Sequence, residues 1–266
     1  MEKTLVLSPR YTSDSIALNT VAIETGWTVE RLQSWRPPAH LFNREVVPYG
    51  EPLFAAVVAD TLQHILIEPR LSWVAEIPLD FRQRDVQFTN LATARTQGRR
   101  SFIKPADDKC FPARIYESGS DLPFDGLEGS IPVLISEPVS WEIEFRCFVL
   151  EQQVAALSVY SRKGELAEDE RGNWPAADSE LQEAVLFANS VLHDARFGFP
   201  PAGVLDIGII RNRGWAVVEA NACWGSGIYG CNPRGVLETL SRSCCRKDGL
   251  PESDQRWTVD RSKANA

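Results

Sequence analysis

Acidic and amide side chains occur together at the ends of two apolar segments late in the chain. Residues 203–210 (GVLDIGII) contain Asp206, and residues 215–221 (WAVVEAN) contain Glu219 and Asn221. Both segments predict strands, and the R-N-R-G run between them predicts a hairpin turn. Strand alternation puts Glu219 and Asn221 on one face, and the hairpin partner could bring Asp206 to that face. Three oxygen ligands at one point would suit Mg²⁺; the alternative is an exposed Asp and a salt-bridged Glu.

A lysine lies at the end of an apolar segment upstream of these strands. Lys104 follows Phe102 and Ile103 and precedes Pro105, and a lysine placed there could act as a point charge against phosphate. Lys109 lies in the polar loop that follows, which could fold over a nucleotide. The alternative for each lysine is an ordinary solvent-facing side chain.

Residues 141–150 alternate with a period of two, which predicts a strand with one polar face. Glu144 and Arg146 share that face. A carboxylate there could hold ribose hydroxyls, and an arginine could stabilise negative charge on a transferred phosphate. The alternative is an exposed Glu–Arg pair of small energetic value.

Four segments, in this order, resemble the ATP-grasp superfamily, and most closely its small RimK-like branch. They are F-I-K-P-A-D-D-K-C-F, P-V-L-I-S-E-P-V-S-W-E-I-E-F-R-C-F-V, V-L-D-I-G and V-V-E-A-N-A-C-W-G-S-G, within residues 80–240. The resemblance implies an α+β ATP-grasp fold, in which two subdomains clasp ATP, preceded by a small α/β domain. We expect the small domain at 1–80, the subdomains at 81–138 and 139–245, and a polar, disordered tail at 246–266.

The resemblance also implies roles for particular residues. Lys104 and Lys109 would contact the nucleotide phosphates, Glu144 the ribose, and Arg146 the γ-phosphate or the substrate. The adenine would be read by the backbone of a hinge made of Ile135, Ser136, Glu137 and Pro138. The loop Trp224-Gly225-Ser226-Gly227 would lie beside an acylphosphate. Asp206, Glu219 and Asn221 would bind magnesium, with two ions expected, Glu219 bridging them, and Mn²⁺ as an alternative ion.

These roles imply an enzyme that activates a carboxylate with ATP, as an acylphosphate, for attack by an amine. Lys104 and Arg146 would be its catalytic side chains. The substrates would be small-molecule or peptide carboxylates and amines. Two other functions stay open: an ATP-binding regulatory or interaction module without turnover, and a phosphotransferase.

The elements that must position these residues follow from apolar patterning. The segments expected as strands are 3–8, 27–29, 53–59, 65–67, 101–103, 113–116, 132–136, 141–150, 154–160, 203–210 and 215–220. The segments expected as helices are 13–26, 84–98, 178–197 and 232–244.

Composition limits the class of protein further. The 266 residues carry a formal net charge of -8, which argues against a nucleic-acid partner. The six cysteines show no C-x-x-C spacing, so we expect reduced thiols rather than a zinc site. Neither a signal peptide nor a membrane span is predicted, which favours a cytoplasmic protein without a membrane partner. A homodimer stays open.

Overall fold

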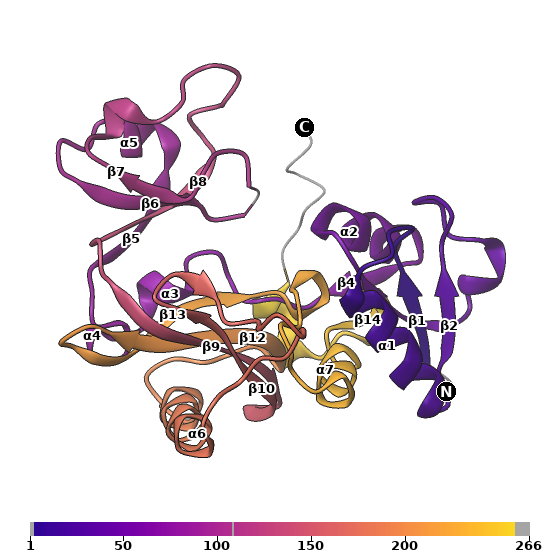
Figure 1. The fold of residues 1–266 in the computed structure, drawn as a ribbon. Coiled ribbons are helices and arrows are strands. Elements are labelled where there is room, and N and C mark those ends of the chain that lie inside the picture. Colours follow the sequence, from indigo (N-terminus) through magenta and orange to yellow (C-terminus); the bar gives the residue numbers. More distant parts are fainter. Residues whose placement is uncertain (1–2, 108, 259–266) are drawn as a thin grey trace.

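The computed structural model of the chain describes residues 3–107 and 109–258. Its N-terminal unit is a parallel three-stranded sheet in the order β2-β1-β3, with a helix following β1 and another following β3 (Figure 1). The elements are β1 (Lys3–Leu7), α1 (Ser13–Glu24), β2 (Thr28–Arg31), β3 (Glu45–Tyr49) and α2 (Pro52–Thr61). Pro48 fits into β3 because that strand is at the edge of the sheet.

A second, small sheet of four antiparallel strands stands apart from the rest of the molecule (Figure 1). Its elements are β5 (Val86–Asn90), α5 (Leu91–Arg95), β6 (Ser101–Pro105), β7 (Arg114–Tyr116) and β8 (Pro132–Ser136). The strand order is β5-β8-β6-β7, and the sheet has its own core around Leu91, Ile103 and Ile135. Lys104 is the next-to-last residue of β6 and lies where this sheet faces the larger one.

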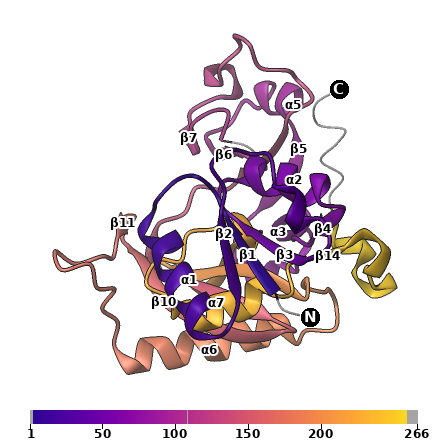
Figure 2. The same cartoon turned by 90° about the vertical axis from the view of Figure 1, so that its right-hand side faces the viewer.

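The third sheet, here called the large sheet, has five antiparallel strands in the order β11-β10-β9-β12-β13. Its elements are β9 (Trp141–Leu150), β10 (Gln153–Arg162), β11 (Glu165–Leu166), α6 (Asp178–Leu192), β12 (Ala202–Ile210) and β13 (Gly214–Asn221). The small sheet and α6 lie on opposite sides of the large sheet in both views (Figure 1 and Figure 2). Phe145 and Cys147 of β9 pack in the core under α6, so Glu144 and Arg146 face away from it, as the alternation predicts.

The remaining elements are short and lie within or between the three units. They are the helices α3 (Trp73–Glu76), α4 (Leu79–Arg82) and α7 (Pro233–Leu240), the strands β4 (His64–Leu66) and β14 (Cys244–Arg246), and the 3-10 helices Ala39–Leu41, Gly119–Asp121, Cys223–Gly225, Lys247–Gly249 and Glu252–Trp257. β14 pairs with β4, so the chain returns to its N-terminal unit. Within the described residues, no helix is long and apolar enough to cross a membrane.

The described part of the expected tail is ordered rather than free. Trp257 is buried, and Glu68 N–H donates to its carbonyl at 2.8 Å. Asp254 is also buried and forms an ion pair with Arg242 at 2.5 Å. These contacts hold residues 247–258 against the protein, and the expectation for residues 259–266 lies outside the described residues.

Two expected elements have the wrong type. Residues 53–59 form most of α2 instead of a strand: Pro52 takes the first helical position, and Phe54 and Val58 are buried at helical spacing. Residues 84–98 do not form one helix. Residues 86–90 pair with β8 as a strand, and Asn90 then caps the short helix α5 by accepting from Thr93 N–H at 2.9 Å.

Two expected helices are shorter than predicted. α6 ends at Leu192 because Asp194 accepts a hydrogen bond from Arg196 N–H at 2.8 Å, a local turn that competes with the helix. α7 ends at Leu240, and the residues after it pair with β4. Both differences show tertiary and side-chain contacts overriding an apolar pattern.

Candidate functional site

Asp206 is at the centre of the candidate site, on a strand that is paired on both sides. It lies opposite Arg146 of β9 and opposite Glu219 of β13. Arg146 donates from Nε to Oδ1 at 2.9 Å and from Nη2 to Oδ2 at 2.6 Å, and it also donates to Gly227 O at 2.9 Å. Burial raises the pKa of Asp206, and the Arg146 guanidinium opposes that rise. The result is a bidentate ion pair without exposed carboxylate.

A β-bulge decides on which face Glu219 lies. Val217 pairs with Ile207, but Glu219, and not Val218, pairs with Asp206. Simple alternation would put Glu219 on the face of Trp215 and Val217, which belong to the core under α6. The extra residue Val218 reverses that alternation. Glu219 and Asn221 therefore lie on the face of Asp206, as expected, but only because of the bulge.

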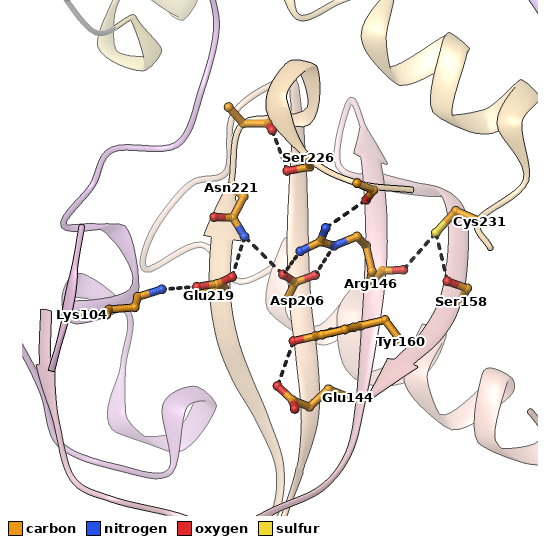
Figure 3. Close-up of polar contacts among 12 residues, drawn as sticks. Lys104, Glu144, Arg146, Ser158, Tyr160, Asp206, Glu219, Asn221, Ser226 and Cys231 are labelled. Carbon is orange, nitrogen blue, oxygen red and sulfur yellow. Dashed lines mark hydrogen bonds and ion pairs between the residues drawn. The ribbon is translucent and has the colours of Figure 1, made fainter. Parts of the chain in front are cut away.

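Hydrogen bonds and ion pairs join five of the predicted residues into one cluster (Figure 3): Lys104, Arg146, Asp206, Glu219 and Asn221. Asn221 Nδ2 donates to Asp206 Oδ2 at 3.2 Å and to Glu219 Oε1 at 2.8 Å. Lys104 reaches across from the small sheet and pairs with the other oxygen of Glu219. Burial alone would raise the pKa of Glu219, but Lys104, Asn221 and Arg146 lower it to about 2. Glu219 is therefore a carboxylate at neutral pH.

The cluster fits a magnesium–phosphate site by the chemistry of its donors. Two carboxylates and one amide oxygen are hard ligands, and Mg²⁺ usually takes few protein ligands and completes its shell with phosphates and water. The described residues contain no group of three His, Cys, Asp or Glu side chains that could hold a metal by themselves. Phosphate oxygens would thus be needed to complete the site around Asp206, Glu219 and Asn221.

Glu144 lies two residues from Arg146 on the same face but takes part in a separate contact. Tyr160 donates its hydroxyl to Glu144 Oε2 at 2.9 Å. Burial raises the pKa of Glu144. The Tyr160 ring stacks on Tyr229, and the Arg146 guanidinium lies 4.7 Å from the centre of the Tyr229 ring. Glu144 is therefore beside the cluster and linked to it through aromatic rings.

A cavity of about 180 Å³ lies next to the cluster, between the N-terminal unit and the two later sheets. Both predicted lysines, Lys104 and Lys109, line it, together with Glu219 and Asn221. The other walls come from Pro52 at the start of α2, Arg70 and Val74, Leu134 of β8, and the loop that contains Trp224, Gly225 and Ser226. Residues of the small sheet, the large sheet and the N-terminal unit thus line one cavity.

The expected hinge lies where the chain passes from the small sheet to the large one. Ile135 and Ser136 belong to β8 and are paired with β5 on one side and β6 on the other. Glu137 N–H donates to Asp85 O at 3.0 Å, and the Glu137 carboxylate pairs with Arg213 at 2.5 Å. These groups are already bonded within the protein, so an adenine contact would have to use the remaining backbone groups of the segment.

Several side chains at the site have little or no signal in the sequence. Tyr160 and Tyr229 flank Arg146, Arg70 lines the cavity, and Arg84 bonds to β13 beside Glu219. Arg84 lies in a polar R-Q-R-D run without periodicity, so the sequence carries no signal for it. Tyr160 is the extra residue of a β-bulge in β10, where Ser161 pairs with Glu144, so the sequence carries no clear signal for it either.

Comparisons with known proteins identify the family and the fold. A profile of an ATP-grasp domain family, described as family 2 of the R-2-K clade, matches residues 81–239. The chain is similar to the crystal structure of a RimK-domain ATP-grasp protein from Sphaerobacter thermophilus DSM 20745, with 13% identity, 90% of this chain and 98% of that chain covered, and a TM-score of 0.50. It is also similar to D-alanine–D-alanine ligase from Bacillus anthracis complexed with ATP, with 12% identity, 94% and 99% covered, and a TM-score of 0.50.

At these identities the two structures show the fold alone. No curated protein sequence matches the chain. The family profile covers more than half of the chain and spans Lys104, Arg146, Asp206, Glu219 and Asn221. The ATP-grasp fold expected from the sequence is therefore confirmed, and the chain belongs to this clade family of ATP-grasp domains.

Proposed function

We propose that the protein is an ATP- and Mg²⁺-dependent ligase that activates a carboxylate as an acylphosphate for attack by an amine. The observation that carries this proposal is the convergence of Lys104, Arg146, Asp206, Glu219 and Asn221 from two facing sheets. The similarity in fold to an ATP-complexed D-alanine–D-alanine ligase supports a nucleotide between those sheets.

The charges of the cluster suit a triphosphate. Lys104 would leave Glu219 and bind phosphate oxygens, while Lys109 from the same cavity wall would add a second positive charge. Glu219, Asp206 and Asn221 would hold Mg²⁺, whose charge would neutralise the triphosphate. The segment 135–138 would contact adenine, and Glu144 would accept hydrogen bonds from the ribose.

In the reaction, a negatively charged carboxylate would have to approach the negatively charged γ-phosphate. Arg146 lies beside the cluster and could reduce the repulsion between them. A carboxylate oxygen would attack the γ-phosphorus, and the bond to ADP would break. The amine would then attack the acyl carbon, lose a proton, and release phosphate that contains one former carboxylate oxygen. The guanidinium of Arg146, fixed by Asp206 and Gly227 O, is preorganised to stabilise the negative charge in both steps.

The cavity suggests where the acceptor substrates lie. Pro52, Arg70 and Ser226 line it together with Glu219 and Asn221. Tyr49 donates its hydroxyl to Ser226 O at 2.9 Å, which fixes this loop against the N-terminal unit. We therefore assign small-molecule or peptide carboxylates and amines to this cavity, beside the loop of Ser226.

A general trap can test the chemistry before the natural amine is known. The purified chain is incubated with Mg-ATP, pools of ¹⁸O-labelled carboxylates (amino acids, acylated amino acids, short peptides) and hydroxylamine as the amine. The proposal predicts a hydroxamate, ADP and ¹⁸O-containing phosphate in equal amounts for at least one pool. The Glu219→Gln variant should form none of them, whereas Glu142→Gln, near the exposed start of β9, should act like the wild type.

The other outcomes distinguish the alternatives. ADP release that does not depend on a carboxylate contradicts the ligase proposal. A stable phosphorylated product without hydroxamate would indicate a phosphotransferase. Tight ATP binding without turnover of any pool would indicate a regulatory or interaction module.

A further inference from the structure

Arg84 is a buried arginine that bonds to backbone carbonyls of β13. It lies between α4 and β5, and 7% of its surface is exposed. Nη1 donates to Val217 O at 2.6 Å, and Nη2 donates to Val218 O at 2.7 Å. Nη1 also donates to Arg82 O at 3.0 Å, and the guanidinium lies 5.0 Å from the centre of the Trp141 ring. The two terminal nitrogens of the guanidinium thus bind the carbonyls of two successive residues of β13.

Burying the positive charge of Arg84 costs free energy. Among the described residues, Arg84 forms no ion pair with a carboxylate; its partners are carbonyls and an aromatic ring. Burial lowers its pKa to about 10. The charges of Glu219, Glu144 and Glu137 oppose this lowering, but within the described part of the chain the hydrogen bonds of the guanidinium all go to carbonyls, so these carbonyls fix its position.

The carbonyls that Arg84 holds are at the β-bulge. The pairing with β12 shifts between Val217 and Glu219, and Val218 is the extra residue between them. β13 is the edge strand of the large sheet, so among the described strands none pairs with its outer side. A bulge leaves local backbone groups outside the ladder, and the planar fork of an arginine can satisfy two of them at once.

From this geometry we propose that Arg84 is a positioning residue for Glu219 and Asn221. It fixes the bulge that turns both side chains from the core face to the face of Asp206. This inference rests on the proposed metal–nucleotide function of that face. Without the fork, β13 would sample the alternating register, in which Glu219 points toward the core.

The place of Arg84 in the chain adds a second effect. It directly precedes Asp85, whose carbonyl accepts the hydrogen bond from Glu137 N–H, and then β5 begins. Arg84 thus ties the segment that enters the small sheet to the strand that carries Glu219. The small sheet also carries Lys104. Arg84 therefore connects the strand that carries Glu219 to the sheet that carries Lys104, the partner of Glu219 in the ion pair.

The test compares Arg84→Lys and Arg84→Gln with the matched variant Arg82→Lys. Arg82 is also held by carbonyls, with Nη1 donating to Ala75 O at 2.6 Å and to Val86 O at 3.4 Å, and neither of these carbonyls belongs to β13. Calorimetry measures ATP affinity with Mg²⁺ and with a chelator, and electron paramagnetic resonance of Mn²⁺ measures the metal in the ATP complex. All measurements are made well below the unfolding temperature of each variant.

We predict that the Arg84 variants lose metal-dependent ATP affinity but keep metal-free ATP affinity. In both Arg84 variants the gain in ATP affinity caused by metal should fall about tenfold or more, the usual effect of losing a support of metal ligands, while metal-free ATP affinity stays near that of the wild type. Arg82→Lys should lower the unfolding temperature without changing the metal gain. If metal strengthens ATP binding as much in the Arg84 variants as in the wild type, the role of Arg84 is contradicted and the proposed function still stands. Absence of any metal gain in the wild type overturns the proposed function, and this inference with it.

Discussion

Lys104 and Glu219 form an ion pair across the space between the small and the large sheet, although 115 residues separate them in the chain. The lysine expected on the phosphates thus neutralises the carboxylate expected on the metal. About a quarter of each side chain is exposed, so the pair is open to exchange of partners. A metal–triphosphate complex has the charges to replace both members at once.

Replacing Lys104 should weaken nucleotide binding directly. A charge-assisted hydrogen bond to phosphate is worth about 1.5–3 kcal/mol, so Lys104→Met should raise the Kd for Mg-ATP by about tenfold to a hundredfold. Lys247→Met removes a lysine that pairs with Asp60 on the surface and should leave the Kd unchanged. Calorimetric titration with Mg-ATP measures both, and equal affinities of wild type and Lys104→Met would refute the assignment of Lys104.

The Arg146–Asp206 pair should show strong coupling in stability. Both side chains are buried, so removing one partner leaves an uncompensated charge, which costs about 3–5 kcal/mol. The double variant Arg146→Met/Asp206→Asn should therefore cost clearly less than the sum of the single variants. Urea unfolding of all four proteins gives the free energies of unfolding.

A matched cycle on Arg246 and Asp248 provides the control, because that pair is exposed and 3.4 Å apart. Its coupling should be close to zero. Additive effects at Arg146 and Asp206, within about 0.5 kcal/mol, would show that the two side chains do not act as a buried pair.

Glu180 should make the unfolding temperature depend on pH in the acidic range. Its hydrogen bonds from Arg162, at 2.8 and 2.9 Å, lower its pKa from 4.5 to about 2, and it also caps α6 by accepting from Ala177 N–H. A carboxylate with a lowered pKa stabilises the fold above its unfolded pKa, and this contribution is lost as the pH falls from 4.5 toward 2. The difference in unfolding temperature between wild type and Glu180→Gln should thus be largest near neutral pH and shrink below pH 4.5. A difference that stays constant between pH 6 and pH 3 would contradict this role.

Glu144 and Arg146 could be predicted as site residues because the residues around them alternate regularly between apolar and polar. Residues 141–150 alternate cleanly, so the face of Glu144 and Arg146 was clear, and the order of the motifs indicated the ATP-grasp fold. The helix at residues 52–61 was missed because a short apolar run fits a buried strand equally well. Strand β5 was missed because its partner β8 lies at the other end of the small sheet's sequence, so the pairing leaves no local pattern.

The face of Glu219 could not be derived from alternation. Strict alternation from the buried Val217 sends Glu219 into the core, and only the extra residue Val218 reverses it. A bulge depends on partners that are distant in sequence, here Arg84, whose bonds to Val217 and Val218 have no local signature. The cavity walls at Pro52 and Arg70 were missed for the same reason, since only the folded chain brings them to Asn221.

The central claim is that Asp206, Glu219 and Asn221 bind ATP through a metal ion. Its most direct test is the Kd for ATP, measured with Mg²⁺ and with a chelator, in the wild type, Glu219→Gln and the control Glu142→Gln. We predict that Mg²⁺ strengthens ATP binding by about tenfold or more in the wild type and the control, and that Glu219→Gln loses this gain. A gain from Mg²⁺ that is as large in Glu219→Gln as in the wild type would contradict the assignment of this cluster.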